Sequence, residues 1–144
     1  MAAVATTWLV GDVGATHARF GLMSPEGALL HSGAVLAADF ASIVEAITAY
    51  LDERRDLPRP RRVALAVAAP IAGDRIRMTN HPWSFSIDAL RRELGFEGLE
   101  VINDFTAVAL ALPHLSAEDR IAVGGGAPVA GRPLAVLGPG SGLG

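Results

Sequence analysis

Two polar residues, Asn103 and Asp104, lie between two apolar segments of this sequence and are the first candidates for chemistry. Residues 99–102 before them predict the end of a buried strand, and residues 105–112 after them predict a helix with one apolar face. In open α/β folds, such a join lies at the carboxyl edge of the sheet, where ligands bind. Asp104 is therefore a candidate general base. The alternative is a structural role, because Asn and Asp at this position also cap helices.

A second candidate is the segment GDVGATHAR, residues 11–19. Its glycines bracket two stretches of strand character, which predicts a hairpin with Gly14, Ala15 and Thr16 at the turn. Asp12 comes just before this turn, after a buried strand. The backbone N–H groups of the turn, with a hydroxyl beside them, could bind an anion. An ordinary hairpin turn would account for the same residues.

Two further segments combine polar residues with irregular structure. The loop at residues 71–85 holds Asn80, His81 and Trp83 close together, which favours contact with a small molecule. A loop whose polar groups bond its own backbone is the alternative. At the other end of the chain, GPGSGLG follows a strand-like segment, and a glycine-rich loop in that position often binds phosphate. It nearly matches a dinucleotide fingerprint, but Leu143 stands where the last glycine belongs.

The rest of the sequence predicts the elements that position these candidates. After the hairpin, residues 28–36 predict a third strand. A capping box at Ser42 then begins an amphipathic helix that continues to about Arg54. An apolar run at residues 63–68 predicts a strand that is covered on both faces.

Ser86 caps a second helix, which ends at Gly95. The strand and helix around Asn103 follow, and Pro113 breaks that helix. Beyond Pro113 the sequence predicts a weak strand at 120–123, a glycine turn at 124–126 and a strong strand at 134–137. The order up to Leu112 is three antiparallel strands, helix, strand, helix, strand, helix, which predicts an α/β fold with a mixed sheet.

The composition limits the classes of function. The chain has 144 residues, a formal net charge of −3 and no cysteine, so it shows no footprint for nucleic acid, no attraction to anionic membranes and no disulfide framework. No segment approaches the ~20 apolar residues that span a bilayer, and the N-terminus lacks the basic start of a signal peptide. A cytoplasmic location is therefore expected. The arginines of residues 54–62 flank Pro58 and Pro60, which favours a solvated loop over a phosphate patch.

Five motifs occur together in one order and spacing: GDVGATHAR, AVAAPIAGD, MTNHPWSFS, VINDFTAVA and LGPGSGLG. They resemble the bacterial ATP-dependent glucokinases, in the superfamily of sugar kinases, actin and heat-shock ATPases. The resemblance covers essentially the whole chain, but only the first half or so of a complete enzyme. It implies a ribonuclease H-like, actin-like ATPase fold, with a small domain at residues 1–114 and the start of a larger, truncated domain at residues 115–144. The sugar would bind in the cleft between them.

The resemblance also assigns roles to residues. Asp104 resembles the base that takes the proton from the sugar 6-hydroxyl, and Asn103 resembles a ligand of the sugar hydroxyls. Asn80 and His81 lie in a loop that approaches the sugar. The first phosphate loop would comprise Gly11, Asp12, Val13, Gly14, Ala15 and Thr16. Asp12 would also orient Mg²⁺ through water. The second phosphate loop would contain Gly138, Gly140, Ser141 and Gly142.

The sequence departs from the family pattern at two positions. Ala15 stands where Gly is usual, and His17 stands where Asn is usual, so the phosphate turn is more crowded and its polar neighbour differs. A methyl group at residue 15 is expected to weaken nucleotide binding without abolishing it.

The resemblance implies a glucokinase that uses ATP and Mg²⁺ to make glucose 6-phosphate in glycolysis. Glucose and ATP are thus the expected partners, and a homodimer is one assembly that it allows. Residues 1–144 alone are expected to be inactive. Two alternatives stay open: a kinase for another hexose, or a non-catalytic sugar- or nucleotide-binding regulator of the same fold. The presence of both Asp12 and Asp104 argues against the regulator, because a pure binder needs no base.

Overall fold

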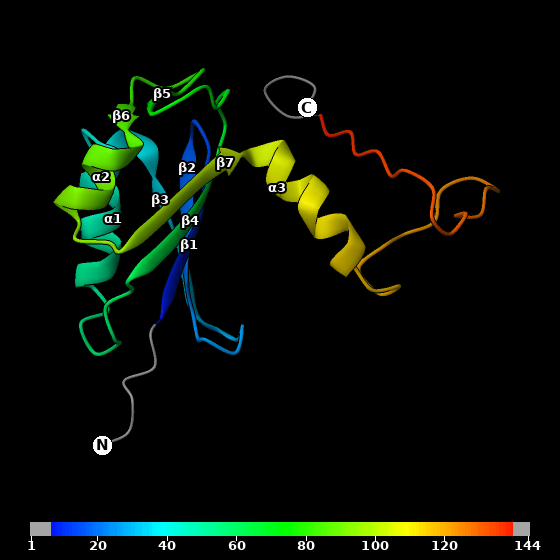
Figure 1. The fold of residues 1–144 in the computed structure, drawn as a ribbon, viewed down its shortest axis with the longest axis horizontal. Coiled ribbons are helices and arrows are strands. Elements are labelled where there is room, and N and C mark those ends of the chain that lie inside the picture. Colours follow the sequence, from blue (N-terminus) through cyan, green and yellow to red (C-terminus); the bar gives the residue numbers. More distant parts are fainter. Residues whose placement is uncertain (1–6, 140–144) are drawn as a thin grey trace. The chain divides into compact units, whose positions relative to one another are not determined.

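The structure is a computed structural model that describes residues 7–139, and a five-stranded mixed sheet is its largest sheet (Figure 1). Its strands are β1 Trp8–Val13, β2 His17–Met23, β3 Leu29–Leu36, β4 Arg62–Val67 and β7 Gly98–Asn103. A separate two-stranded ribbon pairs β5 Arg75–Arg77 with β6 Ser84–Ser86. The helices are α1 Ile43–Asp52, α2 Ile87–Glu93 and α3 Asp104–Ala111, and short 3₁₀ turns lie at Ala37–Asp39 and Leu112–His114.

The strand order of the large sheet is β3-β2-β1-β4-β7. The pairs β1–β2 and β2–β3 are antiparallel, while β4 is parallel to both β1 and β7. The predicted order of three antiparallel strands followed by alternating helices and strands is therefore confirmed. On β4, Val63, Leu65 and Val67 face the core, whereas Ala64 and Ala66 are only half-buried. The complete cover of both faces that the apolar run predicted is not seen in the described residues.

One apolar core lies between the sheet and helices α1 and α2, which cover the same face of it (Figure 1). Its large, fully buried side chains come from neighbouring strands and from the inner face of α1, among them Phe20, Leu65, Ile47 and Tyr50. Burial of each such side chain contributes about 1.5–3 kcal/mol. The core therefore fixes β1, β2 and β4 against α1.

Side-chain caps begin α1 and α2 at the residues that the sequence predicts. Ser42 Oγ accepts the Glu45 N–H at 3.2 Å, and the Glu45 carboxylate accepts the backbone N–H of the residue before Ser42. Ser86 Oγ accepts the Ala89 N–H at 3.0 Å. Gly95 follows α2 with a φ of +72°, a conformation that favours glycine after a helix.

The carboxylate of Asp74, the residue before β5, also caps α2. Asp74 Oδ1 accepts the Asp88 N–H at 2.8 Å, and the Asp74 carbonyl accepts the Ile87 N–H at 2.9 Å. The hydrogen bond from the Ser86 hydroxyl, followed by the one from the Asp88 N–H, lowers the pKa of Asp74 below its usual value. Asp74 thus fastens the ribbon to the start of α2.

Replacing Asp74 with Ala is expected to lower the midpoint of urea unfolding at pH 7. Because the pKa of Asp74 is lower in the folded than in the unfolded state, its carboxylate stabilises the fold above the unfolded-state pKa. This stabilisation is lost as the pH falls through the folded-state pKa, so the difference between parent and variant should shrink below about pH 4. Asp56→Ala, at an exposed aspartate after α1, is the matched control. An equal loss in the control, or a difference that persists in acid, would contradict the capping role.

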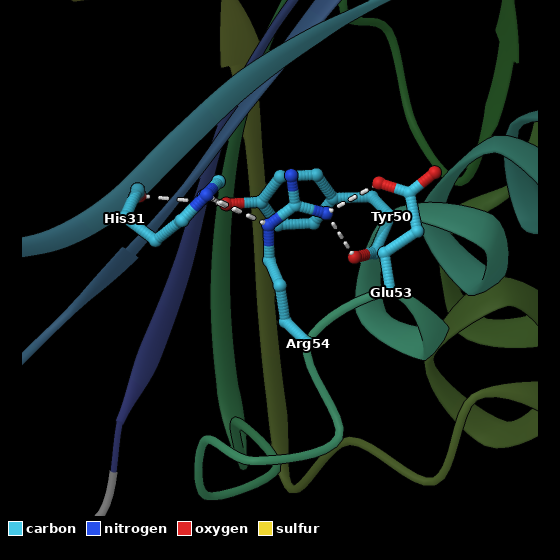
Figure 2. A network of polar contacts seen from close by, with 4 residues as sticks. All are labelled: His31, Tyr50, Glu53 and Arg54. Carbon is cyan, nitrogen blue, oxygen red and sulfur yellow. Dashed lines mark hydrogen bonds and ion pairs between the residues drawn. The ribbon is translucent and has the colours of Figure 1, made fainter.

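Arg54 does not lie in a solvated loop, so the sequence-based prediction is wrong for this residue (Figure 2). Its side chain is only 15 % exposed, and its guanidinium carbon lies 4.1 Å from the centroid of the Tyr50 ring. Nε donates to His31 Nδ1 at 2.7 Å, and Nη1 donates to the Tyr50 carbonyl at 2.7 Å and to the Glu53 carboxylate at 3.0 Å. These contacts fasten the end of α1 to β3. The next three arginines are at least 61 % exposed, as a solvated loop requires.

The segment after Asp104 differs most from the predictions. α3 carries apolar residues around its whole circumference rather than on one face, and it ends at Ala111, so Leu112 falls in the following 3₁₀ turn. The strands predicted at 120–123 and 134–137 are absent from the described residues, where their apolar side chains are largely exposed. A strand needs a neighbour for its N–H and C=O groups, and residues 105–139 offer it none.

The chain divides into two compact units between Asp104 and Phe105. The boundary expected at residue 114 concerns the domains of a longer protein and stays a prediction. Among residues 7–139, no helix is both long enough and apolar enough to cross a membrane.

Candidate functional site

The carboxyl edge of the large sheet brings two of the predicted candidates together. In the parallel register, Val13 at the end of β1 lies opposite Val67, and Val67 lies opposite Asn103 at the end of β7. Neighbouring strands are ~4.8 Å apart, so Val13 and Asn103 are separated by about 10 Å. The hairpin turn at residues 14–16 and the pair of Asn103 with Asp104 therefore leave the sheet at the same edge.

The hairpin turn uses one of its N–H groups to close itself. The Gly14 N–H donates to the His17 carbonyl at 2.9 Å. No backbone carbonyl of the described residues accepts the N–H groups of Ala15 or Thr16. An anion at this turn would therefore meet these two N–H groups rather than the three that an open turn would offer.

Two members of the predicted first phosphate loop have a packing role. A Cβ at Gly11 would lie 2.7 Å from Leu65 Cδ2 and 3.0 Å from Phe20 Cδ1, so only glycine fits here. Val13 is completely buried, and its carbonyl accepts the Ala68 N–H at 3.0 Å. A part in phosphate binding stays a prediction for both residues, and for Val13 it could involve only the backbone.

Asp12 is exposed and lies opposite Arg19 in the register of β1 and β2. Arg19 Nη1 donates to Asp12 Oδ2 at 3.2 Å. A turn of three residues at 14–16 would place Asp12 opposite Ala18, so this ion pair could not be predicted; the observed pair Val13↔Ala18 shifts the register by one residue and brings Arg19 opposite Asp12. In the described part of the chain, no group of three or more Asp, Glu, His or Cys side chains could hold a metal ion by itself. A lone carboxylate fits Mg²⁺ when water and nucleotide phosphates supply the other ligands.

The side chain of Asn103 connects Asp104 to the segment that follows β4. Asn103 Nδ2 lies 2.9 Å from Asp104 Oδ1 and 3.2 Å from the Ala69 carbonyl oxygen. Both oxygens are acceptors, so the amide donates one N–H to each. Asp104 is half-buried and is the first residue of α3. Asp104 can therefore serve both as a base and as a polar group at the start of the helix.

Asn80 and His81 lie at the tip of the ribbon, in a segment that the sequence predicts to be an irregular loop. Trp83 is buried and its Nε1–H donates to the Phe40 carbonyl at 3.0 Å, which anchors the tip. The Trp83 N–H donates to His81 Nδ1 at 3.4 Å, and the two rings pack edge to face. His81 therefore bonds its own loop, as the structural alternative held, while Asn80 is exposed.

The second phosphate loop is described at one of its predicted residues. At Gly138 a Cβ would overlap the Phe105 ring of the same unit, so any other residue here would require that half-buried ring to move. Gly140, Ser141 and Gly142 lie outside the described residues.

The fold and the sheet-edge site define a class of proteins. The structure matches that of a ROK family glucokinase from Streptomyces griseus in complex with glucose and AMPPNP, with a TM-score of 0.53 at 23 % identity. The match covers 72 % of this chain and 35 % of that one, and at this identity it shows the fold alone. The fold is the actin-like, ribonuclease H-like α/β fold of the sugar kinases.

Closer matches identify the family. The Glucokinase family model matches residues 9–144. A glucokinase of Aromatoleum aromaticum is 52 % identical over 137 residues, which cover 94 % of this chain and 41 % of that protein. The crystal structure of a glucokinase from an Antarctic psychrotroph gives a TM-score of 0.81 at 34 % identity, over 95 % of this chain and 44 % of that one. The chain belongs to the glucokinase family, and it spans less than half the length of these relatives.

Proposed function

We propose that these residues are part of a glucokinase, which transfers the γ-phosphoryl group of ATP to the 6-hydroxyl of glucose. The observation that supports this most is the sheet edge, where a carboxylate, Asp104, follows a strand that ends about 10 Å from the phosphate-type turn. Phosphoryl transfer demands positioning, neutralisation of the phosphate charge and one carboxylate near the attacking hydroxyl. The carboxyl edge of the sheet carries both the phosphate-type turn and the Asp104 carboxylate.

On the sugar side, Asp104 accepts the proton of the 6-hydroxyl as its oxygen attacks phosphorus. Asn103 contacts a sugar hydroxyl through Oδ1, because both of its N–H groups already have acceptors. Asn80 and His81 form the part of the loop that approaches the sugar.

On the nucleotide side, residues 11–16 form the first phosphate loop, with the N–H groups of Ala15 and Thr16 facing the phosphates. Residues 138–142 form the second phosphate loop. Asp12 holds Mg²⁺ through water, and this ion supplies neutralisation of the phosphate charge when bound. Arg19 pairs with Asp12 and orients its carboxylate at the turn.

Residues 1–114 form the small domain of the whole protein, and residues 115–144 begin the larger one. The protein works in the cytoplasm on glucose and ATP, without nucleic acid or membrane. A homodimer is the assembly that we propose for it.

A chimera tests this function: these 144 residues replace the matching part of the Aromatoleum aromaticum glucokinase. With ATP and Mg²⁺, a coupled assay should detect glucose 6-phosphate from the chimera and none from the 144-residue chain alone. The reason is that kinases of this kind assemble the site only when two domains close on the substrates. Faster turnover of another hexose would support the alternative kinase. Binding of sugar or nucleotide without turnover would support the regulator.

A further inference from the structure

The amide group of Asn103 is held by buried backbone. Its acceptor two residues beyond β4, the Ala69 carbonyl, belongs to a residue that is 2 % exposed and whose own N–H donates to the Val67 carbonyl at 2.8 Å. The preceding N–H, of Ala68, donates to the Val13 carbonyl at 3.0 Å. Adjacent strands of the sheet therefore fix the position of the Ala69 oxygen, and through it the Asn103 amide.

The second N–H of the same amide reaches the carboxylate of the next residue. Asn103 Nδ2 and Asp104 Oδ1 are 2.9 Å apart, a normal length for a hydrogen bond to a charged acceptor. An Asp side chain at the first residue of a helix has several staggered rotamers available. A donor that is itself fixed to the sheet selects the rotamers that keep Oδ1 in contact with it.

We propose that Asn103 is a positioning residue, which uses its amide N–H groups to hold the Asp104 carboxylate in the orientation needed for proton transfer. The inference rests on the proposed function, because it assigns Asn103 a role in the reaction of the same site. It differs from a role as sugar ligand, which involves Oδ1 rather than the two N–H groups. A small misplacement of a reacting group can cost a large factor in rate, so the loss of this contact should affect turnover more than sugar affinity.

The contact itself can be tested without any activity. The chain contains two asparagines, Asn80 and Asn103, and no glutamine, so a ¹⁵N-labelled sample gives side-chain amide signals from two residues only. The Asn103 signals should exchange with water about tenfold more slowly than those of exposed Asn80. In Asp104→Ala the Asn103 signals should shift and exchange faster, while those of Asn80 stay in place. Asp104→Glu, which displaces the carboxylate by one methylene, replaces the Ala variant if that variant fails to fold. Unchanged Asn103 signals would overturn the proposal.

The positioning role is tested in the chimera with Asn103→Asp. This variant keeps the size of the side chain and an acceptor oxygen, but it has no N–H groups. We expect kcat to fall by about 10–100-fold, with the glucose Kd from calorimetry changed less than about threefold. Ser32→Asp, which adds a carboxylate at an exposed position of β3, is the matched control and should leave both values unchanged.

A double-mutant cycle separates positioning from a merely structural role. If Asn103 acts through Asp104, adding Asn103→Asp to an Asp104→Asn chimera should lower kcat by less than about threefold further. Additive losses, or a raised glucose Kd with unchanged kcat, would overturn the proposal and leave a structural role or a sugar ligand. If the unsubstituted chimera phosphorylated no hexose, the proposed function would fail, and the reaction role of Asn103 with it. An active chimera with full turnover in Asn103→Asp would overturn the positioning role alone.

Discussion

Replacing Asp104 with Asn in the chimera is expected to lower kcat by roughly 10²–10⁴, the usual worth of a positioned general base. This corresponds to about 3–5 kcal/mol of transition-state stabilisation. The amide has nearly the size of the carboxylate and keeps an acceptor oxygen, but it cannot take up the proton of the sugar hydroxyl. Glucose affinity should therefore change by no more than several-fold. A coupled assay gives kcat, and calorimetry gives the Kd for glucose.

The helix-cap alternative makes the opposite prediction for the same variant. If Asp104 served only the start of α3, turnover would barely change while the free energy of unfolding fell. Asp56→Asn is the matched control, since Asp56 is exposed in the loop after α1 and has no assigned role. Its kcat and its unfolding midpoint should both equal those of the parent.

Replacing Tyr50 with Ala is expected to lower the free energy of unfolding by about 3–5 kcal/mol, the range for deletion of a buried aromatic ring. The Tyr50 side chain is 1 % exposed, and its ring lies 5.4 Å from the Phe20 ring, centroid to centroid. The ring also contacts the Arg54 guanidinium, and the hydroxyl lies 3.3 Å from His31 Nδ1 and donates to the His31 carbonyl at 3.4 Å (Figure 2). The substitution therefore removes core volume and separates α1 from β3. Urea unfolding followed by tryptophan fluorescence measures the loss.

Tyr50→Phe is the matched variant for the hydroxyl alone. It keeps the ring, so the loss should be only about 0.5–1.5 kcal/mol. Burial raises the pKa of Tyr50, an effect that the charge of Arg54 opposes. The neutral phenol therefore stabilises the fold below the unfolded-state pKa of about 10, and this advantage over Phe disappears as the pH rises through the raised folded-state pKa. A loss for Ala no larger than for Phe would show that the ring does not support the core.

Local signals in the sequence accounted for much of the first unit. Ser42 and Ser86 could be predicted as helix caps because a capping hydroxyl accepts the N–H of the residue three positions later in the chain. No residue distant in sequence takes part. The turn at residues 14–16 followed from the glycines and from the strands around it. The position of Asn103 at the carboxyl edge followed from the change of hydrophobic period between strand and helix. Each of these inferences used residues that are neighbours in the chain.

Contacts between residues that are far apart in the chain could not be predicted from these local signals. The sequence gives no sign that Arg54 stacks on Tyr50 and reaches His31, because arginine near prolines is usually solvated. The acceptor for Asn103, a backbone carbonyl at Ala69, has no side-chain signature at all. The β5–β6 ribbon could not be predicted from the sequence because each of its strands has only three residues. The strands expected after residue 119 show the converse error, since apolar sequence predicts a strand only where another strand can pair with it.

The space at Gly11 also limits how this sequence can change. Every single-base change in a glycine codon is silent, stops translation or introduces a residue with a Cβ. That atom would meet Leu65 and Phe20, whose side chains are 1 % and 2 % exposed and have no room to move aside. Position 11 can therefore vary only together with a smaller residue at position 65 or 20. Since each single substitution would leave either a clash or a cavity, β1, which leads into the hairpin turn at residues 14–16, is constrained against stepwise change at this position.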